Sequence, residues 1–329
     1  MIEVSNNHCK KETKKMIKIE TVINPILIQV FTGLTHSYFQ RLANRLSPLW
    51  EETEYIRLLN KDRIRGIGGG TKYKLNTIEA KLFFYLLYCR HYVNQRVIAG
   101  LCKLDQSNIS RLFERIEKLI AQAEDPQLKI FLENMKDKRV AEGLSFAELK
   151  ILYPEIEKVI TDVTEIRCNR PQNKERRKHK TSGKKKQYSL KKQISITKSN
   201  RIIGISKTYQ GKIHDFNIEK QEAMIGKVPK ETFQPVDLGY VGINKIFPEH
   251  YVIIPPKKTK NCELNAFLKD LKRAHSRQRI PIEHVFASLK KFNVLKNYRG
   301  RDERLDNVFD NIAAINNLCL GRHNMNKFK

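Results

Sequence analysis

The spacing of apolar residues changes midway along the chain, and this change limits the folds that it can adopt. Up to residue 121 apolar residues recur every three or four positions, as in helices, whereas from Lys158 onward short segments alternate or run apolar, as strands do. Strands are predicted over 158–166, 187–197, 202–209, 234–237 and 251–254, with a turn at Ser199–Asn200. Helices are predicted over 215–224, 264–275, 279–292 and 304–320. Strands followed by alternating strands and helices predict an α/β domain with a mixed sheet.

The first part of the chain is predicted to be helical. Its helices are expected over 36–59, 77–89, 94–101 and 107–120, and a helical connector over 125–154. Thr77 and Ser107 are suitable N-cap residues for two of them. The basic, glycine-rich segment 63–70 follows the first helix. Its flexibility suits a plain hinge as well as an arm lying along phosphates.

Segment 95–112 has the spacing of a helix-turn-helix. Its apolar positions are Val97, Ile98 and Leu101, and 102–105 is a tight connection. The outward side of the second helix carries side chains that can reach base edges or phosphates in a major groove: Gln106, Asn108, Ser110 and Arg111. An ordinary helical hairpin has the same pattern, so the motif alone leaves both interpretations open.

The charge of the chain indicates a polyanionic partner. It has 63 Lys and Arg against 35 Asp and Glu, a formal net charge of +28, which a nucleic-acid backbone would balance. Ten basic residues crowd segment 174–192, among them Lys184, Lys185 and Lys186. This segment suits a loop that grips phosphates, although a solvated charge run has the same composition. The cysteines form no C-x-x-C spacing, and no apolar run approaches the ~20 residues of a membrane-spanning helix.

Three acidic residues stand out from this basic background: Asp162, Asp237 and Glu283. Asp162 lies on an apolar strand, where a buried carboxylate is costly unless it binds something. Glu283 shares a helix face with Arg279 and Lys290, which suits a metal ligand whose neighbours grip phosphates, but also a surface salt-bridge ladder. Singly, the three acids could equally be a strand-end cap, a turn residue and a helix-surface charge. Together they could hold two Mg²⁺ or Mn²⁺ ions ~4 Å apart, as phosphodiester cleavage requires.

The sequence motifs around these acids resemble, in their order, the signature of DDE transposases. They are Asp162-Val-Thr, Asp237-Leu-Gly-Tyr, and Arg279-x-x-x-Glu283 followed seven residues later by Lys290. The likeness is to the bacterial insertion-sequence-five group and the related Harbinger-type endonucleases. It extends through Ser182-Gly-Lys-Lys-Lys and Gly211-Lys-Ile-His-Asp-Phe, and covers roughly residues 35–320. Two departures leave the metal ligands in place: Ser276 stands where the family often has tyrosine, and Val163 where it often has glycine or alanine.

The resemblance implies an α/β fold in which an RNase H-like mixed-sheet catalytic core follows an all-α helix-turn-helix domain. The expected divisions are an N-terminal helical region with its linker, the helix-turn-helix, the connector and the catalytic domain, at 1–70, 71–123, 124–154 and 155–329. Asp162, Asp237 and Glu283 are then the catalytic residues that bind two Mg²⁺ ions, for which Mn²⁺ can substitute. Asp215 competes with Asp237 for the second position, but it precedes a predicted helix and suits an N-cap better.

The resemblance also implies an activity and its partners. Water would nick the ends of the chain's own mobile element, and the freed 3′-hydroxyl would attack target DNA. The partners are double-stranded DNA, as terminal inverted repeats and target, and a second copy of the chain, in the bacterial cytoplasm at the nucleoid. DNA contacts are expected from the helix-turn-helix, the basic segment, Arg279 and Lys290. The alternative is an inactive transposase-derived DNA-binding protein or repressor; an RNA-binding protein lacks the aromatic-rich motif it would need.

Overall fold

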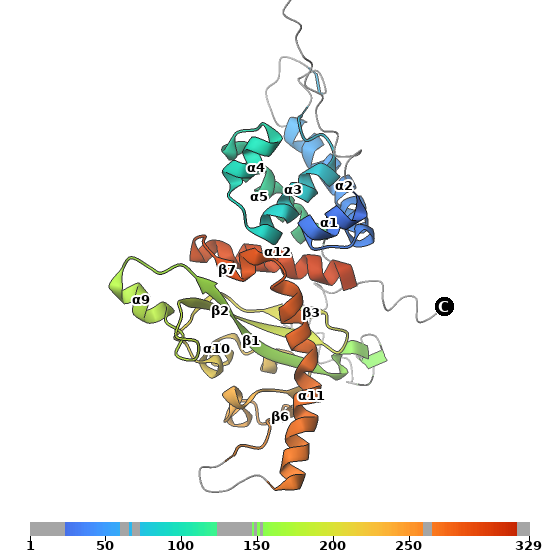
Figure 1. Cartoon of the computed structure of the whole chain (residues 1–329). Helices are drawn as coiled ribbons and strands as arrows, with labels where there is room; N and C mark the ends of the chain where they lie inside the picture. The colour runs from blue at the N-terminus through green and yellow to red at the C-terminus, as the bar shows by residue number, and fades with distance from the viewer. Residues whose placement is uncertain are drawn as a thin grey trace, which may run out of the picture.

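The computed structural model describes residues 24–59, 66–67, 73–123, 147, 150–151, 154–258 and 265–320. These form an all-helical part stacked on an α/β part, with α12 between them (Figure 1). Most of the predicted glycine-rich segment and connector lies outside the described residues. Within the described part, no helix is both long and apolar enough to cross a membrane.

Among the described residues, the first part contains five helices: α1 (Pro25–Thr32), α2 (His36–Leu59), α3 (Ile78–His91), α4 (Gln95–Cys102) and α5 (Gln106–Ala123). All four helices predicted here are confirmed, and α1 is an addition, capped by Asn24. Helix α1 packs on α3, and α2 packs on both α3 and α5. The helices on both sides of the glycine-rich segment therefore share one core.

The two predicted N-caps have different outcomes. The Thr77 hydroxyl accepts the N–H of Ala80 at 3.2 Å and caps α3 as predicted. The Ser107 prediction is wrong, because α5 already begins at Gln106 and the carbonyl of Asp105 accepts its first helical N–H groups. Ser107 lies in the first turn of α5.

Helix α4 leaves two of the three apolar positions of the predicted helix-turn-helix in solvent. Ile98 is fully buried, whereas Val97 is 54% exposed and Leu101 64% exposed. The helix is short and packs against α3 and α5 on one side only. The outer face of α4 therefore exposes Val97 and Leu101 to solvent and is not part of the core.

The sheet of the second part is mixed, as predicted. Its antiparallel strands are β1 (Val159–Cys168), β2 (Ser189–Thr197) and β3 (Ile202–Ile205), and β7 (Asn297–Tyr298) lies parallel to β1, in the order β3-β2-β1-β7. The two-residue β4 (Tyr209–Gln210) also pairs with β2. A parallel pair, β5 (Gln234–Pro235) and β6 (Val252–Ile253), adjoins the start of β1 through a bridge between Lys158 and Phe233. Every predicted strand overlaps an observed one, with β1 running two residues past its predicted end. The segment 202–209 is divided between β3 and the start of β4, and β7 is an addition.

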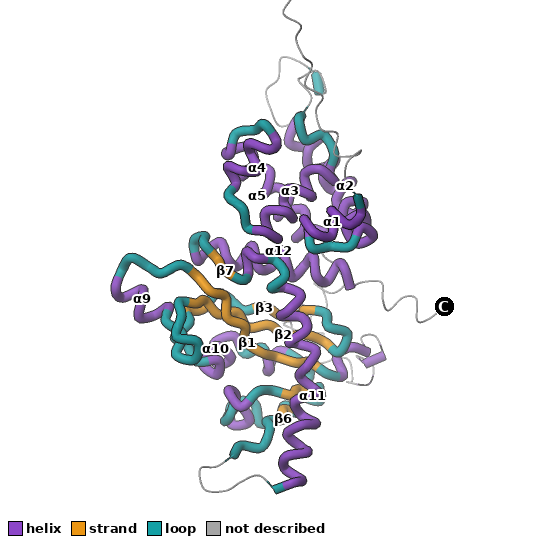
Figure 2. Tube along the Cα trace, viewed as in Figure 1, coloured by secondary structure: helices purple, strands orange, loops and turns teal. Residues whose placement is uncertain are grey.

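Where the structure describes this part, it has four helices: α9 (Lys174–Lys180), α10 (Asp215–Glu222), α11 (Ala266–Leu289) and α12 (Asp302–Leu320). A short 3₁₀ turn at Pro154–Glu157 precedes β1, and others lie between the helices at Ile225–Lys227, Leu238–Tyr240, Ile243–Lys245 and Asn293–Leu295. The two helices predicted over 264–275 and 279–292 are in fact the single helix α11 (Figure 2), so that division is wrong. Pro281 lies inside α11. Although proline removes one helical hydrogen bond, the following turn is fixed by packing, because Ile282, Val285 and Phe286 are buried.

The two parts are joined through aromatic and arginine contacts. Tyr92, at the end of α3, stacks on Tyr298 of β7 with ring centroids 6.4 Å apart. The Arg299 guanidinium lies 4.3 Å from the centre of the Tyr92 ring and donates to the Tyr92 carbonyl. Helix α12 also contacts α5 and α2, and one buried apolar cluster runs through both parts. The helical part is therefore held in a fixed orientation on the sheet.

Candidate active site

Arg279 brings together the two aspartates that the sequence singles out. Asp162 lies on the central strand β1, and Asp237 follows β5. From α11, Arg279 donates through Nη2 to Asp162 Oδ2 and through Nη1 to Asp237 Oδ1, the latter at 3.1 Å. The side chains of Asp162 and Arg279 are 13% and 16% exposed, and that of Asp237 is 46% exposed. The pair is thus a partly buried site with its open side at Asp237.

The Asp162 carboxyl is held on both oxygens. Its Oδ1 accepts the N–H of Val163 at 2.8 Å, and its Oδ2 accepts from Arg279. Burial raises the pKa of Asp162 to about 6, against the lowering effects of Arg279 and the Val163 N–H; the charges of Asp237 and Glu283 add to the rise. The desolvation cost of the Asp162 carboxylate on its apolar strand is therefore only partly offset by the ion pair with Arg279.

Glu283 lies on α11 one turn after Arg279 and is exposed. Its charge contributes to the raised pKa of Asp162, which places the two carboxyls within electrostatic reach. The opposite face of the helix is buried as predicted, with Ile282, Val285, Phe286, Leu289 and, just beyond it, Phe292. The structure therefore brings Asp162 and Asp237 together at Arg279, and Glu283 lies one helical turn further along α11.

The donor types suit a divalent metal ion, but the carboxylates do not yet form a cage. Carboxylate oxygens are the ligands that Mg²⁺ and Mn²⁺ prefer. Among the described residues, however, no group of three His, Cys, Asp or Glu side chains stands close enough to hold a metal ion. Arg279 lies between Asp162 and Asp237, where a cation shared by them would be. The residues present fit a metal ion once this guanidinium moves.

Asp215 is engaged elsewhere. Its Oδ1 accepts from Lys191 Nζ at 2.9 Å. The prediction that it caps a helix is wrong by one residue, because the cap of α10 is His214, whose Nδ1 accepts the N–H of Phe216. Asp215 is the first residue of that helix and pairs with a lysine of β2.

The lysines of the Ser182-Gly-Lys-Lys-Lys segment lie on a tight turn beside the site. Glu165, three residues after Asp162 on β1, accepts from the Ser182 hydroxyl at 3.0 Å. Lys184, Lys185 and Lys186 are exposed on this turn. Burial and the positive charge of Lys185 lower the pKa of Lys290, and the negative charge of Glu283 opposes this lowering in part. The basic turn therefore lies close to the Glu283 end of α11.

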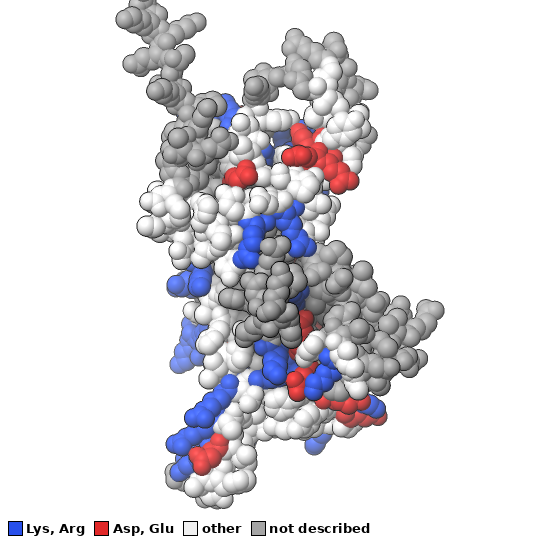
Figure 3. Space-filling model, turned by 90° about the vertical axis from the view of Figure 1, so that its right-hand side faces the viewer, with Lys and Arg blue, Asp and Glu red and all other residues white. Residues whose placement is uncertain are grey.

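The end of the basic run is not a surface loop. Lys191 and Lys192 belong to β2 and are 8% and 1% exposed. Lys191 donates to Asp215 and Lys192 to Asp306 of α12, so both hold the sheet to its helices. The prediction that segment 174–192 is a loop that grips phosphates is therefore wrong for Lys191 and Lys192. On the face shown in Figure 3, Lys and Arg side chains form several separate patches with acidic groups between them.

The helix-turn-helix candidates lie on the outer side of α5. Gln106, Asn108 and Arg111 are exposed, and Ser110 is half-buried. Gln106 Nε2 donates to Gln95 Oε1 of α4 at 2.9 Å, so its amide is already oriented. The structure thus places these side chains on one helix without assigning them a ligand.

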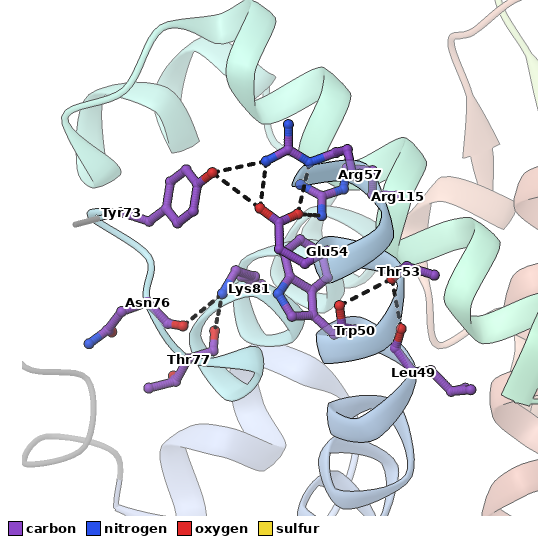
Figure 4. A network of polar contacts seen from close by, with 10 residues as sticks. All are labelled: Leu49, Trp50, Thr53, Glu54, Arg57, Tyr73, Asn76, Thr77, Lys81 and Arg115. Carbon is purple, nitrogen blue, oxygen red and sulfur yellow. Dashed lines mark hydrogen bonds and ion pairs between the residues drawn. The ribbon is translucent and has the colours of Figure 1, made fainter. Parts of the chain in front are cut away.

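A charged network that the sequence pattern does not reveal fixes α5 in place (Figure 4). Glu54 of α2 accepts from Arg57, from Arg115 of α5 and from the Tyr73 hydroxyl. Burial would raise the pKa of Glu54, but the two arginines hold it at about 2. The Trp50 ring lies 4.0 Å from the Arg115 guanidinium and 4.7 Å from Lys81 Nζ. Helix α5 is therefore tied to α2 through its buried side.

A second buried network supports the turn that carries Asp237. The Asp237 carbonyl accepts the N–H of Tyr240 at 3.0 Å, and the buried Tyr240 hydroxyl accepts from Gln193 Nε2 at 3.1 Å. Gln193 also donates to Glu219, whose other oxygen accepts the N–H of Ile225. Glu219 was not predicted, since an acid on an ordinary helix carries no local signal. Tyr240 was singled out only as part of the Asp237-Leu-Gly-Tyr motif, and its buried hydrogen bond was not predicted.

The Glu219 carboxyl predicts a pH-dependent stability. Burial raises its pKa to about 7, so the folded state keeps a proton that the unfolded state releases above pH 4.5. Stability should therefore fall as pH rises from about 4.5 to 7. A Glu219→Gln variant lacks this ionisation. The difference in unfolding free energy, variant minus wild type, should therefore rise by about 3 kcal/mol from pH 4.5 to pH 8. Urea unfolding at both pH values measures the gain; Glu231→Gln, at an exposed position, is the control. A pH-independent difference would contradict the assignment.

Comparison with known proteins identifies the family of the chain. Residues 161–324 match the model of a family described as DDE superfamily endonuclease. The protein described as "Probable transposase for insertion sequence element IS702" from Microchaete diplosiphon is 31% identical to this chain over 242 residues, which are 73% of this chain and 80% of that protein. No solved structure matches the chain. The chain therefore belongs to the DDE-superfamily transposases of insertion sequences.

Proposed function

We propose that the chain binds the ends of its own insertion sequence and carries out metal-dependent DNA cleavage and strand transfer with Asp162, Asp237 and Glu283. The observation that carries this proposal is the pairing of Arg279 with both aspartates, one helical turn from Glu283. The net charge of +28 and membership of a transposase family support DNA as the substrate.

The three carboxylates would hold two divalent ions, Mg²⁺ or Mn²⁺. When bound, such ions activate the attacking hydroxyl and stabilise the leaving oxygen. An aspartate on the central strand, another after a later strand and a glutamate on a following helix are the arrangement expected of an RNase H-like core. Lys185 and Lys290, close to Glu283, would neutralise phosphates of the bound strand.

DNA ends would be recognised by the helical part. Gln106, Asn108 and Arg111 of α5 would face a major groove in the terminal inverted repeats, as the second helix of a helix-turn-helix does. Cutting two ends together requires two copies of the chain, so the proposal includes a homodimer on DNA, at the nucleoid in the bacterial cytoplasm. Target DNA would enter after the first cut.

The test uses labelled DNA carrying the sequences that flank the gene. Purified protein should cut this DNA at the flanks with Mg²⁺ and not with EDTA. Glu283→Gln should lose cutting by at least ~10²-fold, because it removes a charge from the metal site. Glu303→Gln, at an exposed position in the first turn of α12, should cut normally. Specific binding without cutting would indicate a DNA-binding protein or repressor, and cutting by Glu283→Gln would mean that the third ligand lies elsewhere.

A further inference from the structure

The partners of the Arg279 guanidinium are the residues that the proposed function assigns to metal binding. It spans two carboxylates that come from different elements, β1 and the turn after β5. Arginine can do this because its planar fork presents two donors at once. The side chain lies in the space that a cation shared by Asp162 and Asp237 would need.

The oxygens that Arg279 uses are needed by a metal ion. Asp162 Oδ1 accepts the Val163 N–H, whereas Oδ2, the oxygen that a metal ion could bind without competing with that bond, accepts from Arg279. A hard divalent ion binds carboxylate oxygens at short distances, and a guanidinium that donates to the same oxygen would repel it. Binding of a metal ion to Asp162 therefore competes with the ion pair between Asp162 and Arg279.

The guanidinium is incompletely satisfied where it lies. Its two terminal nitrogens donate to the aspartates, but Nε is buried and has no hydrogen-bond partner. An unmet buried donor opposes the pairing. Asp237 is nearly half exposed, which leaves a side on which the guanidinium can move outward.

We propose that Arg279 is a releasable counter-ion of the catalytic aspartates. It holds Asp162 and Asp237 together before metal binds, and a divalent ion displaces its guanidinium, whose freed donors then suit a DNA phosphate. Metal loading and phosphate gripping are thereby linked through one side chain. This inference rests on the proposed function, because it assigns the competing cation to the same carboxylates.

The experiment measures Mn²⁺ binding without DNA, so that cleavage is not the readout. Mn²⁺ titrations followed by electron paramagnetic resonance are made on the wild type, Arg279→Gln and Arg279→Lys. Arg279→Gln should bind about tenfold more tightly than the wild type, a gain of roughly 1.4 kcal/mol. Arg279→Lys should lie between them, since one ammonium cannot span both aspartates as the fork does. Arg273→Gln on the same helix, whose partner Asp270 is exposed, should bind Mn²⁺ as the wild type does.

A second readout needs no variant and therefore does not depend on variant folding. Phenylglyoxal labelling of Arg279 in wild-type protein, followed by peptide mass spectrometry, should increase when Mn²⁺ replaces EDTA. If the wild type binds Mn²⁺ while Arg279→Gln, shown folded by circular dichroism, binds equally or more weakly, competition is excluded and the metal site stands. If neither protein binds Mn²⁺, the metal site of the proposed function is itself wrong. Unchanged labelling on Mn²⁺ binding would also overturn the release of Arg279.

Discussion

An Asp162→Asn variant should lose metal-dependent DNA cleavage by a factor on the order of 10³ or more while remaining as stable as the wild type. The loss follows from the proposed role of Asp162, because an amide lacks the charge that draws a divalent ion. The retained stability follows from its surroundings. Burial raises the pKa of Asp162 to about 6, so at neutral pH the folded protein carries an incompletely compensated charge that asparagine removes.

The asparagine side chain of this variant can also keep part of the local bonding. Its single carbonyl oxygen can accept either the Val163 N–H or Arg279, while Arg279 keeps Asp237. The measurement combines cleavage of flank DNA in Mg²⁺ with urea unfolding in EDTA. Asp270→Asn, an exposed change on α11, is the matched control and should cut normally. An Asp162→Asn variant that still cuts would remove Asp162 from the site, and one that unfolds would make its role structural.

The main elements could be predicted because each has a strong local pattern. The strand β1 and the helix α2 follow from their apolar spacing, and Asp162 could be singled out because a carboxylate on such a strand is unusual. The division of α11 at residues 275–279 was wrong for a physical reason. Proline weakens a helix locally, but the buried face that begins at Ile282 holds the helix against the sheet, and such packing has no signature in a short window.

The burial and partners of the charged side chains were the features hardest to predict from the sequence. Lys184 and Lys192 look alike in a basic run, yet one is exposed on a turn and the other is 1% exposed. Lys192 is buried because β2 lies between β1 and β3 and because its side chain packs against α12. The bridging role of Arg279 is similar, since it joins residues 42 and 117 positions away in the chain. Sequence spacing placed Arg279 and Glu283 on one helix face but could not show which acid the arginine reaches.

Loss of the Asp306 carboxylate should destabilise the fold by about 3 kcal/mol, because it leaves the buried Lys192 ammonium without its charge partner. Lys192 donates to Asp306 and, at 2.7 Å, to the carbonyl of Ser206. It also lies 5.5 Å from the centre of the Phe309 ring. Its strand neighbour is Thr164, two residues after Asp162, so the Lys192–Asp306 pair ties β1 and β2 to α12.

The two partners should respond unequally to mutation. Asp306 is 38% exposed and also accepts from the Thr208 hydroxyl, so Lys192→Met leaves a carboxylate that water can solvate and should cost only about 1 kcal/mol. Asp306→Ala leaves a cation that water cannot reach, and the double variant should recover most of the loss. Urea unfolding of the four proteins gives the coupling, with Asp270→Ala as an exposed-pair control expected to change stability by less than about 0.5 kcal/mol. Equal costs for the two single changes would show that Lys192 does not depend on Asp306, and that β2 is held to α12 by apolar packing alone.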